Sequence, residues 1–370
     1  ERRAAVGGNC RCETDPETGI EVHLYGSHIF HTRNEEVWNF VNRFTKFNDY
    51  RHRVLAHREG KTYHLPIGCT LLKEFFGRDL KPSDLNAEDR EAIFDAFVRG
   101  YTSKQWGVPP EQVDPSVIAR LKIRDSFSTD YFDDPYQGIP VDGYNAMFER
   151  MLDHPNIVVE CNREFAISSI QTFEHANIYY SGPIDTLFDY KFGPLPWRSL
   201  NFELETLSCR DFQGTSVVNY TEASVPYTRI HEFKHYHPEL KDVMLADQTV
   251  IMREYPKTWE VGDDPYYPIK TEESAALLEK YLAEAGVEMS ILSTTGRGYF
   301  LIAVLDSKGE PSDHAVRELA ASAELLNSWG RPVLILGPVR VSGLDNVHYG
   351  TDSDGNIASM LVSGCNKDKV

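Results

Sequence analysis

Residues 217–235, VVNYTEASVPYTRIHEFKH, lie in the middle of a segment, 196–256, that is rich in Thr, Val, Tyr and Phe. These β-branched and aromatic residues favour strands, because their side chains pack well on a pleated, half-buried surface. The segment therefore predicts mostly strands, and the residues on either side of it indicate what kind of fold they belong to.

Two further stretches nearer the N-terminus also have strand patterns. Residues 20–31, IEVHLYGSHIFH, alternate apolar and polar side chains before Gly26, which predicts a strand followed by a turn. Residues 52–66, HRVLAHREGKTYHLP, predict a hairpin with Glu59 and Gly60 at its tip.

Helical patterns occur between and after these strands. Residues 35–44, EEVWNFVNRF, predict an amphipathic helix. Its apolar side chains, spaced one helical turn apart, are Val37, Phe40, Val41 and Phe44. Helical patterns then dominate residues 70–107, so this part of the chain is expected to form a helical domain.

Short apolar runs return later in the chain. Residues 156–161, NIVVEC, and 176–183, ANIYYSGP, predict two short strands closed by turn residues. Residues 298–306, 313–330 and 331–338 are a strand, a helix and a strand in pattern, with both strands fully apolar. This order predicts a βαβ unit with parallel strands.

The overall composition excludes several classes of protein. The 370 residues carry a formal net charge of −18 and are 41% hydrophobic, so a basic nucleic-acid-binding surface is not expected. No window approaches the roughly 18 consecutive apolar residues of a membrane span. Six cysteines without a C-x-x-C pair favour a reduced, cytoplasmic protein without a zinc or dithiol site.

The segment HEFKH at residues 231–235 matches the H-E-x-x-H pattern of zinc metallohydrolases. In those enzymes His231 and His235 would bind zinc from one face of a helix, and Glu232 would act as general base. The surrounding residues favour strand, and Pro238 follows closely, so we expect a strand with solvated histidines and no bound metal. The zinc enzyme remains an alternative function.

Two other groups of residues could carry chemistry. Residues 97–107, FVRGYTSKQWG, are either a helix end with an aromatic face in the core or a loop that presents Trp106 to a base or sugar. Arg120 and Arg229 could together grip a diphosphate, since each guanidinium can bind phosphate oxygens with two hydrogen bonds. In so acidic a chain, an anionic ligand would need such placed arginines.

Several long segments, in this order, closely resemble the bacterial UDP-galactopyranose mutases. They are YGSHIFHT, GYTSKQWG, DYFDDPYQGIPVDGY, YYSGPIDTLFDYKFG, VPYTRI and EYPKTWEVGDDPYYP. The resemblance covers residues 1–282. It implies an isomerase that interconverts UDP-galactopyranose and UDP-galactofuranose through an adduct between the sugar and N5 of reduced FAD, with a non-catalytic nucleotide-sugar-binding remnant as an alternative.

The resemblance also implies roles for individual residues. The opening ERRAAVGGNC matches the end of the family's second Rossmann strand, so the expected FAD contacts are Glu1, Arg2, Gly8, Asn9, His28 and Ile29. The expected catalytic residues are Arg120, Arg229 and His28. The expected substrate contacts are Phe97, Thr102 and Trp106 for uridine, and Tyr101, Tyr131, Asn219 and Tyr267 for diphosphate and sugar. The family further implies UDP-galactose as substrate, a reductant for the flavin and a homodimer.

The fold expected from these observations is a mixed α/β protein. It comprises a partial Rossmann-type FAD-binding domain (1–66), a helical substrate-loop domain (67–125), an antiparallel sheet domain with returning strands of the FAD domain (126–282), and an α/β tail (283–370). From about residue 290 the tail weakly resembles a thioredoxin-like segment of transglutaminase-like proteins, and it has no dithiol.

The family's G-x-G-x-x-G strand and its closing flavin-lining motif do not occur in the sequence. Without the backbone amides of that loop, the cofactor diphosphate loses its main partners, so we expect poor FAD affinity and impaired activity. The measurement is the visible flavin absorbance of the purified chain. A yellow protein with one FAD per chain would contradict the expectation.

Overall fold

The computed structural model describes residues 1–113, 123–165 and 180–284, together with the backbone of four strands between residues 289 and 350. It divides into two compact units, Glu1–Ser274 and Ala275–Val370. No helix in the described ranges is long and apolar enough to cross a membrane. All the predicted site residues belong to the first unit.

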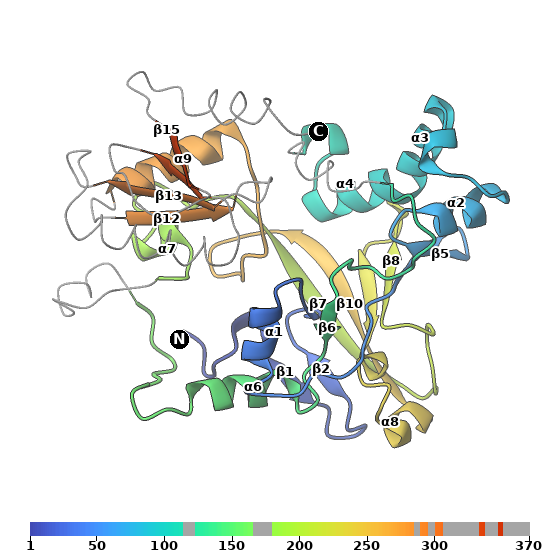
Figure 1. Ribbon diagram of the computed structural model, residues 1–370, viewed down its shortest axis with the longest axis horizontal. Coiled ribbons are helices and arrows are strands. Elements are labelled where there is room, and N and C mark those ends of the chain that lie inside the picture. The colour runs from blue at the N-terminus through green and yellow to red at the C-terminus, as the bar shows by residue number, and fades with distance from the viewer. Residues whose placement is uncertain are drawn as a thin grey trace. The chain divides into compact units, whose positions relative to one another are not determined.

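A seven-stranded sheet forms the centre of the first unit (Figure 1). From edge to edge its strands are β11 (Tyr267–Pro268), β7 (Trp197–Leu207), β10 (Thr249–Thr258), β9 (Arg229–Glu232), β8 (Val217–Tyr220), β4 (Val54–Arg58) and β5 (Lys61–Leu65). All neighbouring pairs are antiparallel except β4 and β8, which are parallel. The strands predicted for residues 196–256 are confirmed.

The predicted hairpin forms one edge of this sheet. Strands β4 and β5 pair in antiparallel register, and both tip residues have positive φ, 50° at Glu59 and 75° at Gly60. A two-residue turn with positive φ at both positions matches the right-handed twist of the strands that it joins. The hairpin prediction is therefore confirmed. Because β4 pairs with β8, the helical segment that follows the hairpin begins near β8.

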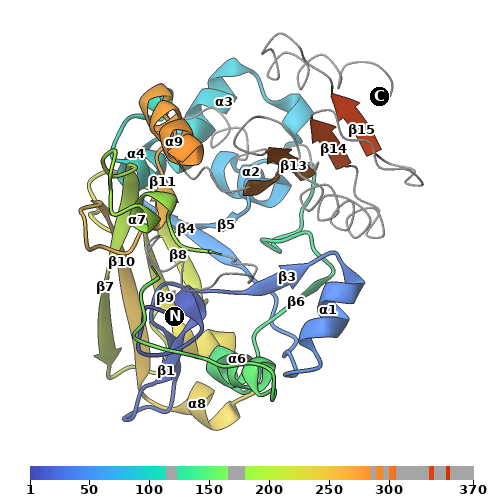
Figure 2. The same ribbon diagram turned by 90° about the vertical axis from the view of Figure 1, so that its left-hand side faces the viewer.

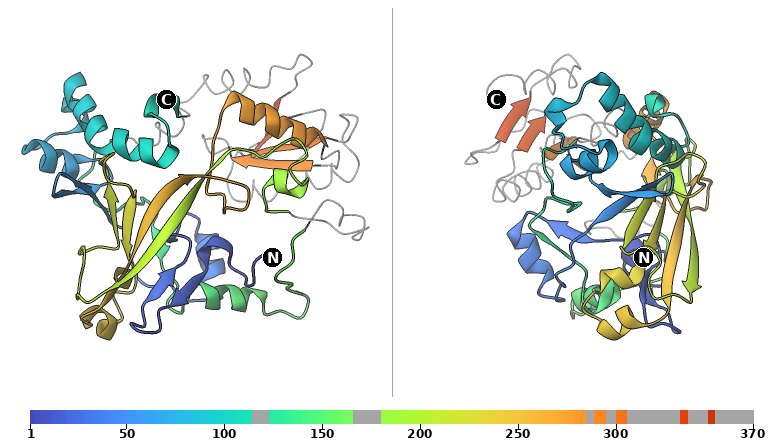
Figure 3. Two further views of the ribbon diagram at one scale, coloured as in Figure 1. Left: turned by 180° about the vertical axis from the view of Figure 1, so that it is seen from behind. Right: turned by 90° about the vertical axis from the view of Figure 1, so that its right-hand side faces the viewer.

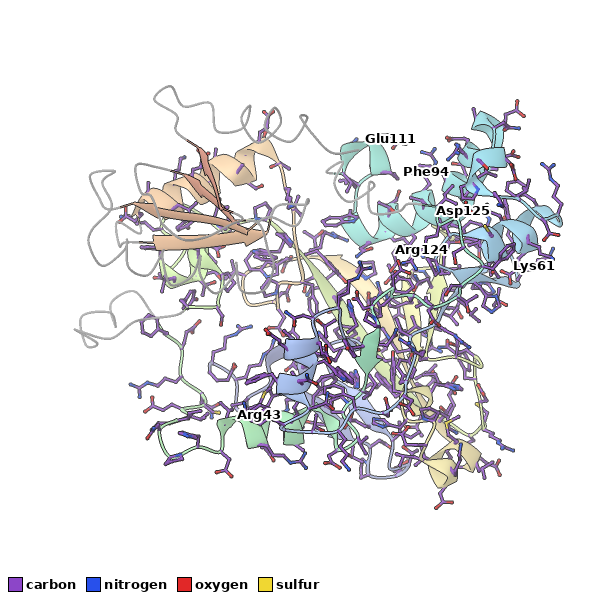
Figure 4. The ribbon with its side chains drawn as sticks, viewed as in Figure 1. Arg43, Lys61, Phe94, Glu111, Arg124 and Asp125 are labelled. Carbon is purple, nitrogen blue, oxygen red and sulfur yellow. The ribbon has the colours of Figure 1, made fainter. Side chains whose placement is uncertain are left out.

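The predicted helices gather beside β4, β5 and β8 at one end of the sheet (Figure 2). They are α2 (Cys69–Phe76), α3 (Ala87–Phe94), the π-helical turn η3 (Asp95–Arg99) and α4 (Gly100–Trp106). Apolar side chains of α2, α3 and η3 form a core of their own with Ala56 of β4. Phe94, Arg124 and Asp125 are labelled at this end in Figure 4. There the amide of Arg124 donates to the carbonyl of Ile67 at 2.8 Å as the chain runs past α2.

Smaller elements lie alongside the sheet toward its other end (Figure 3). They are the hairpin β1 (Cys12–Thr14) and β2 (Glu21–His23), the pair β3 (Phe30–Thr32) and β6 (Tyr136–Gly138), and helices α1 (Glu35–Val41), α6 (Gly143–Leu152) and α8 (Lys241–Leu245). Helix α7 (Ile184–Leu187) does not lie at this end (Figure 2). The prediction for residues 20–31 is confirmed: strand β2 is followed by a turn in which Gly26 has a φ of 90°.

Helix α1 is present as predicted, but its apolar face is different. Val37 and Phe40, which were predicted to be on the buried face, are 37% and 49% exposed. The indole of Trp38 instead stacks against the rings of Phe30 and Tyr136. In a helix of only seven residues, one large aromatic ring can supply most of the contact area, and it decides which face turns inward.

The strand prediction for residues 156–161 is wrong. Their backbone lies outside any sheet, and the side chain of Val158 is 86% exposed. No described strand lies beside these residues. Within the run the amide of Ile157 donates to the carbonyl of His154 at 2.9 Å, and just after it Arg163 donates to the carbonyl of Glu1 at 2.9 Å. An apolar run becomes a strand only where a neighbouring strand can pair with it. Of the second predicted strand, residues 176–179 lie outside the described residues, and residues 180–183 are not extended into a sheet.

The second unit contains a four-stranded sheet in the order β12 (Met289–Thr294), β13 (Phe300–Leu305), β14 (Val333–Leu336), β15 (Val347–Gly350). Strands β13 and β14 are parallel, as the βαβ pattern predicted, and β14 and β15 are parallel as well. The helix predicted at 313–330 lies outside the described residues. Helix α9 (Glu272–Glu284) spans the boundary between the two units.

Helix α4 packs so closely on the loop after β8 that only glycine fits at its first residue. A Cβ on Gly100 would lie 2.3 Å from the carbonyl oxygen of Thr221 and 3.0 Å from the amide of Ala223. Both contacts are with backbone atoms, which cannot move aside by changing rotamer. The close approach sets the position of α4 on the sheet.

We predict that Gly100→Ala lowers the free energy of unfolding by about 1–3 kcal/mol, the usual cost of overpacking a tight contact. Urea unfolding of the full chain measures it. Ser103→Ala in the same helix is the control, with an expected change within about 0.5 kcal/mol. A stability equal to that of the unsubstituted chain would show that α4 can move away from this loop without cost.

Candidate active site

Arg229 lies in a row of polar side chains that crosses three strands. It is directly opposite Asn219 of β8 on one side and Glu254 of β10 on the other. Its Nε lies 3.3 Å from Oε1 of Glu254, and its Nη2 donates to the hydroxyl of Tyr101 at 2.5 Å. Because Tyr101 belongs to α4, this guanidinium joins the helical part of the unit to the sheet.

Glu254 is the buried counter-charge of Arg229. It is 3% exposed, its Oε2 lies 3.3 Å from Nε2 of His231, and its Oε1 accepts from the hydroxyl of Thr228 at 3.1 Å. Burial acts to raise the pKa of Glu254, but Arg229 and the hydrogen bonds from His231 and Thr228 hold it below its usual value. Burial acts to lower the pKa of Arg229, but Glu254 and nearby tyrosines raise it. Both groups are therefore charged at neutral pH.

Aromatic side chains surround this cation. Tyr101, Tyr131 and Tyr267 all interact electrostatically with Arg229. The ring of Trp106, at the end of α4, lies 6.0 Å from that of Tyr267, centroid to centroid. The structure thus brings Tyr101, Trp106, Tyr131, Asn219 and Tyr267, which were all predicted to contact substrate, to the neighbourhood of Arg229. The side chain of Arg229 is 27% exposed, and a guanidinium among flat rings can bind an anion joined to a base or sugar.

Two of the predicted substrate contacts are buried in the structure. Phe97 is 6% exposed, and its ring packs edge-on against Tyr63 and Phe75 in the helical core. Thr102 is 4% exposed. The ring of Phe97 is used for packing, because residues 97–106 lie in the π-helical turn η3 and helix α4 and not in an open loop. Arg120 lies outside the described residues.

Two cations that the sequence did not single out hold α4 in place. Nζ of Lys104 donates to the carbonyls of Tyr220 and Tyr227, at 2.7 and 2.8 Å, on either side of the β8–β9 turn. Burial lowers the pKa of Lys104 to about 8. Arg198 of β7 donates from Nε to the carbonyl of Gln105 at 2.9 Å, at the C-terminal end of the helix. Cations are favourable there, because the last carbonyls of a helix have no partner within it.

A pocket of about 1030 Å³ lies at the N-terminus of the chain. Of the residues predicted to contact FAD, Glu1, Arg2, Gly8 and Asn9 line it, whereas His28 and Ile29 do not. Sequence reasoning missed the aromatic part of the lining, which comprises Tyr180, Tyr190, Trp197 and Trp259. These residues come from separate parts of the chain, so no local pattern joins them. The one signal in the sequence is that each lies in a segment rich in aromatic residues.

The donors of this pocket suit an anionic dinucleotide. Arg2 and Arg3 both reach Oδ1 of Asp264, at 2.5 and 3.0 Å, and Nη1 of Arg3 is buried without a hydrogen-bond partner among the described residues. Gly7 and Gly8 both have positive φ, and a Cβ on Gly8 would meet nothing within 4 Å. An unpaired guanidinium donor beside an open glycine backbone fits a ligand phosphate.

His28 lies between the two regions, on the loop between β2 and β3. Its amide donates to Nδ1 of His23 at 3.1 Å, and its own Nδ1 lies 2.8 Å from the carbonyl of Gly26. Burial lowers the pKa of His28 despite the Gly26 carbonyl. A neutral imidazole held in one orientation is therefore expected at neutral pH.

Comparison with known proteins identifies the family of the chain. The family model for UDP-galactopyranose mutase matches residues 96–298, more than half of the chain. A probable UDP-galactopyranose mutase of Klebsiella pneumoniae is 37% identical over 79% of this chain and 80% of its own length. The dTDP-fucopyranose mutase of Escherichia coli is 35% identical over 78% and 82%, and the UDP-galactopyranose mutase of Mycoplasma pneumoniae is 32% identical over 76% and 79%. The chain belongs to the UDP-galactopyranose mutase family.

The family assignment places the protein among isomerases and also indicates what kind of region the pocket belongs to. A second family model, for an NAD(P)-binding Rossmann-like domain, matches residues 1–44. The part of the pocket formed by Glu1 to Asn9 thus belongs to a Rossmann-like dinucleotide-binding region of this member of the UDP-galactopyranose mutase family. FAD is the dinucleotide that the family implies.

The zinc-enzyme alternative does not survive the structure. His231 and Glu232 end strand β9, and Phe233–Tyr236 form a 3₁₀ turn, so the two histidines do not lie one turn apart on a helix. The strand prediction holds for His231 and Glu232 but not for the residues that follow, and His231 is not solvated, since it is 1% exposed. Both oxygens of Glu232 accept backbone amides, from Phe212 and Gln213 at 2.9 Å. Glu232 therefore anchors a loop, as in other folds where buried carboxylates are fully hydrogen-bonded.

We predict that Glu254→Gln lowers the free energy of unfolding at pH 7 by about 2–3 kcal/mol. The variant leaves Arg229 without its buried counter-charge. Because Arg229 is partly exposed, we expect a smaller loss of stability than for breaking a fully buried ion pair. Glu205→Gln, which removes an exposed partner of Arg253, is the control and should change stability by less than about 0.5 kcal/mol.

The difference in the free energy of unfolding between the unsubstituted chain and Glu254→Gln should depend on pH. The folded-state pKa of Glu254 is below the usual 4.5, so its contribution is fully present above about pH 4.5 and is lost as the pH falls through the folded value. Chemical unfolding at several pH values should show the two proteins converging in acid. A constant difference down to pH 3 would exclude the carboxylate charge as its source.

Proposed function

We propose that this chain is a flavin-dependent isomerase that interconverts UDP-galactopyranose and UDP-galactofuranose. The observation that carries the proposal is the charged, partly exposed Arg229 in a row with Asn219 and Glu254, beside Tyr267. A guanidinium fixed in this way suits a diphosphate. Two of the relatives above are named for UDP-galactopyranose and one for dTDP-fucopyranose, so we choose the uridine nucleotide.

In this proposal Arg229 neutralises the charge that grows on UDP as its bond to the sugar breaks, with Arg120 as the second cation. Preorganised donors of this kind stabilise a transition state because they need no reorganisation at the moment of reaction. The residues that would line the diphosphate and sugar are Tyr101, Tyr131, Asn219 and Tyr267. Trp106 would stack on uridine, whereas Phe97 and Thr102 would support α4 from below.

The pocket at the N-terminus would hold the adenosine half of FAD through Glu1, Arg2, Gly8 and Asn9, with His28 and Ile29 toward the flavin. The chemistry that reduced FAD supplies when bound is a nucleophilic electron pair for the anomeric carbon, with no net oxidation. The part of the protein is to hold the leaving diphosphate and to aim the sugar.

The family context extends the proposal to the whole molecule. We propose a cytoplasmic homodimer that takes UDP-galactose as substrate and depends on an external reductant for its flavin. Within it, residues 1–66, 67–125, 126–282 and 283–370 would serve as the FAD-binding, helical, sheet and tail domains. The sheet domain would supply Asn219 and Arg229, and the helical domain would supply Tyr101.

The test compares binding with turnover in one preparation. Calorimetry measures the affinity for UDP-galactose, with UDP and dTDP as competitors, and chromatography measures conversion with excess FAD under dithionite. Binding together with conversion supports an isomerase. Binding without conversion supports the alternative, a nucleotide-sugar-binding remnant, and tighter binding of dTDP than of UDP would reverse our choice of nucleotide.

We predict that Arg229→Ala lowers kcat by about 10²–10³, by analogy with the loss of one oxyanion-hole donor. Trp106→Ala should mainly raise KM, because stacking on uridine is the same in the ground and transition states. Arg253→Ala, which removes an arginine of β10 that pairs with Glu205, is the control and should leave both constants nearly unchanged. A near-normal kcat for Arg229→Ala would remove Arg229 from the diphosphate site.

A further inference from the structure

A chain of side chains runs from Arg229 back into the fold, away from the aromatic rings. Behind Arg229 lies Glu254, and behind Glu254 lies His231, whose Nε2 is 3.3 Å from Oε2 of the carboxylate. The other ring nitrogen, Nδ1, is 2.6 Å from the hydroxyl of Ser27. His231 is 1% exposed and Glu254 is 3% exposed, so water cannot replace these contacts.

The directions of the hydrogen bonds in this chain follow from the one that Tyr236 donates. The hydroxyl of Tyr236 donates to Oγ of Ser27 at 2.5 Å, so the hydroxyl proton of Ser27 is free to be donated to Nδ1 of His231. A neutral imidazole that accepts at Nδ1 carries its proton on Nε2. That proton points at Glu254, and the carboxylate therefore receives one donor from His231 and faces Arg229 with its other oxygen.

Ser27 belongs to a loop that touches both candidate sites. On one side, the guanidinium of Arg3, which lines the N-terminal pocket, lies 4.1 Å from the ring centroid of Tyr25. On the other, a Cβ on Gly26 would lie only 3.8 Å from Oε2 of Glu254. The loop Tyr25–His28 thus spans the distance from the pocket to the counter-charge of Arg229.

We infer that His231 is a positioning residue: by accepting from Ser27 and donating to Glu254, it holds Arg229 in a fixed orientation relative to the loop Tyr25–His28. This inference rests on the proposed function and deepens it. A reaction between two bound groups needs both in register, and a misplacement of about 1 Å can cost about a hundredfold in rate. His231 keeps Arg229, in the proposed diphosphate site, at a fixed position relative to the loop near the proposed cofactor pocket.

Protonation of His231 would break this arrangement in two ways. A proton on Nδ1 removes the acceptor for Ser27, and the imidazolium then competes with Arg229 for Glu254. The charged and titratable groups that face His231 are Glu254, Arg229, His23, His52 and Tyr236. Burial lowers the pKa of His231 although Glu254 opposes the effect, so the neutral form prevails at pH 7 and the break is expected only in acid.

Three substitutions separate a positioning role from simple packing. In His231→Gln, the side-chain amide can still donate to Glu254 from the position of Nε2. In His231→Asn, the shorter amide can accept from Ser27 but cannot reach Glu254, and His231→Leu fills space with no polar atom. His235→Gln is the matched control, since His235 contacts Asp211 and Glu232 and not Glu254.

The first measurement is the affinity of the full-length chain for UDP-galactose by calorimetry from pH 5 to pH 8. At pH 7 we expect His231→Leu and His231→Asn to weaken binding about tenfold, the worth of one hydrogen bond to a charged group. His231→Gln, which keeps the donor to Glu254 but loses the acceptor for Ser27, should weaken binding by about threefold, and the control should change it by less. The wild-type affinity should fall in acid, and the His231→Gln affinity should not.

The second measurement needs no ligand. The ¹⁵N and ¹H shifts of the Arg229 side-chain Nε–H report its contact with Glu254, and they should move in His231→Leu but stay in place in His231→Gln. Equal shifts, or equal affinities, in the leucine and glutamine variants would overturn the inference. If wild-type chain fails to bind UDP-galactose, the proposed function fails, and the shifts of Arg229 still decide the role of His231.

Discussion

The pairing of Arg229 with Glu254 is the constraint on which the rest of the first unit depends. A carboxylate that is 3% exposed is tolerated only with a cation and further donors at hydrogen-bond distance. The register between β9 and β10 satisfies this requirement, because it sets Arg229 directly opposite Glu254. A slip of one residue would turn both side chains to the other face of the sheet. The same register sets Asn219 opposite Arg229 and brings Thr228 and His231 to Glu254.

The helical part is fixed to this sheet by cations that meet backbone carbonyls. Lys104 reaches the carbonyls at both sides of the β8–β9 turn, and Arg198 reaches the carbonyl of Gln105 at the end of α4. Gly100 allows the helix to approach the loop at backbone distance. These contacts place Tyr101 on Arg229 and Trp106 near Tyr267. The aromatic surroundings of the cation thus depend on three residues that do not themselves face it.

Local patterns of sequence predicted the elements better than the contacts between them. The hairpin tip at Glu59 and Gly60, helices α1 to α4 and the strands of residues 196–256 follow from turn residues and periodicity, which act over a few residues. Glu254 and Lys104 were missed because their importance comes from partners on other elements, which no local pattern encodes. Phe97 was misplaced for a related reason: family resemblance marked its segment as substrate-binding, but its ring faces the helical core. The strand prediction for residues 156–161 was wrong because a strand also needs a neighbouring strand to pair with.

The electrostatic setting explains why orientation matters more here than charge. The chain carries a net charge of −18, so its overall field repels an anionic nucleotide sugar. Glu254 also cancels most of the long-range field of Arg229, and little attraction is left beyond the Debye length of about 8 Å at physiological ionic strength. What Arg229 retains is direction, since the guanidinium donors lie in one plane and can bind phosphate oxygens only along it. An acidic protein that binds a diphosphate with a neutralised arginine must therefore fix that plane, and Glu254 and Tyr101 are the side chains that do so.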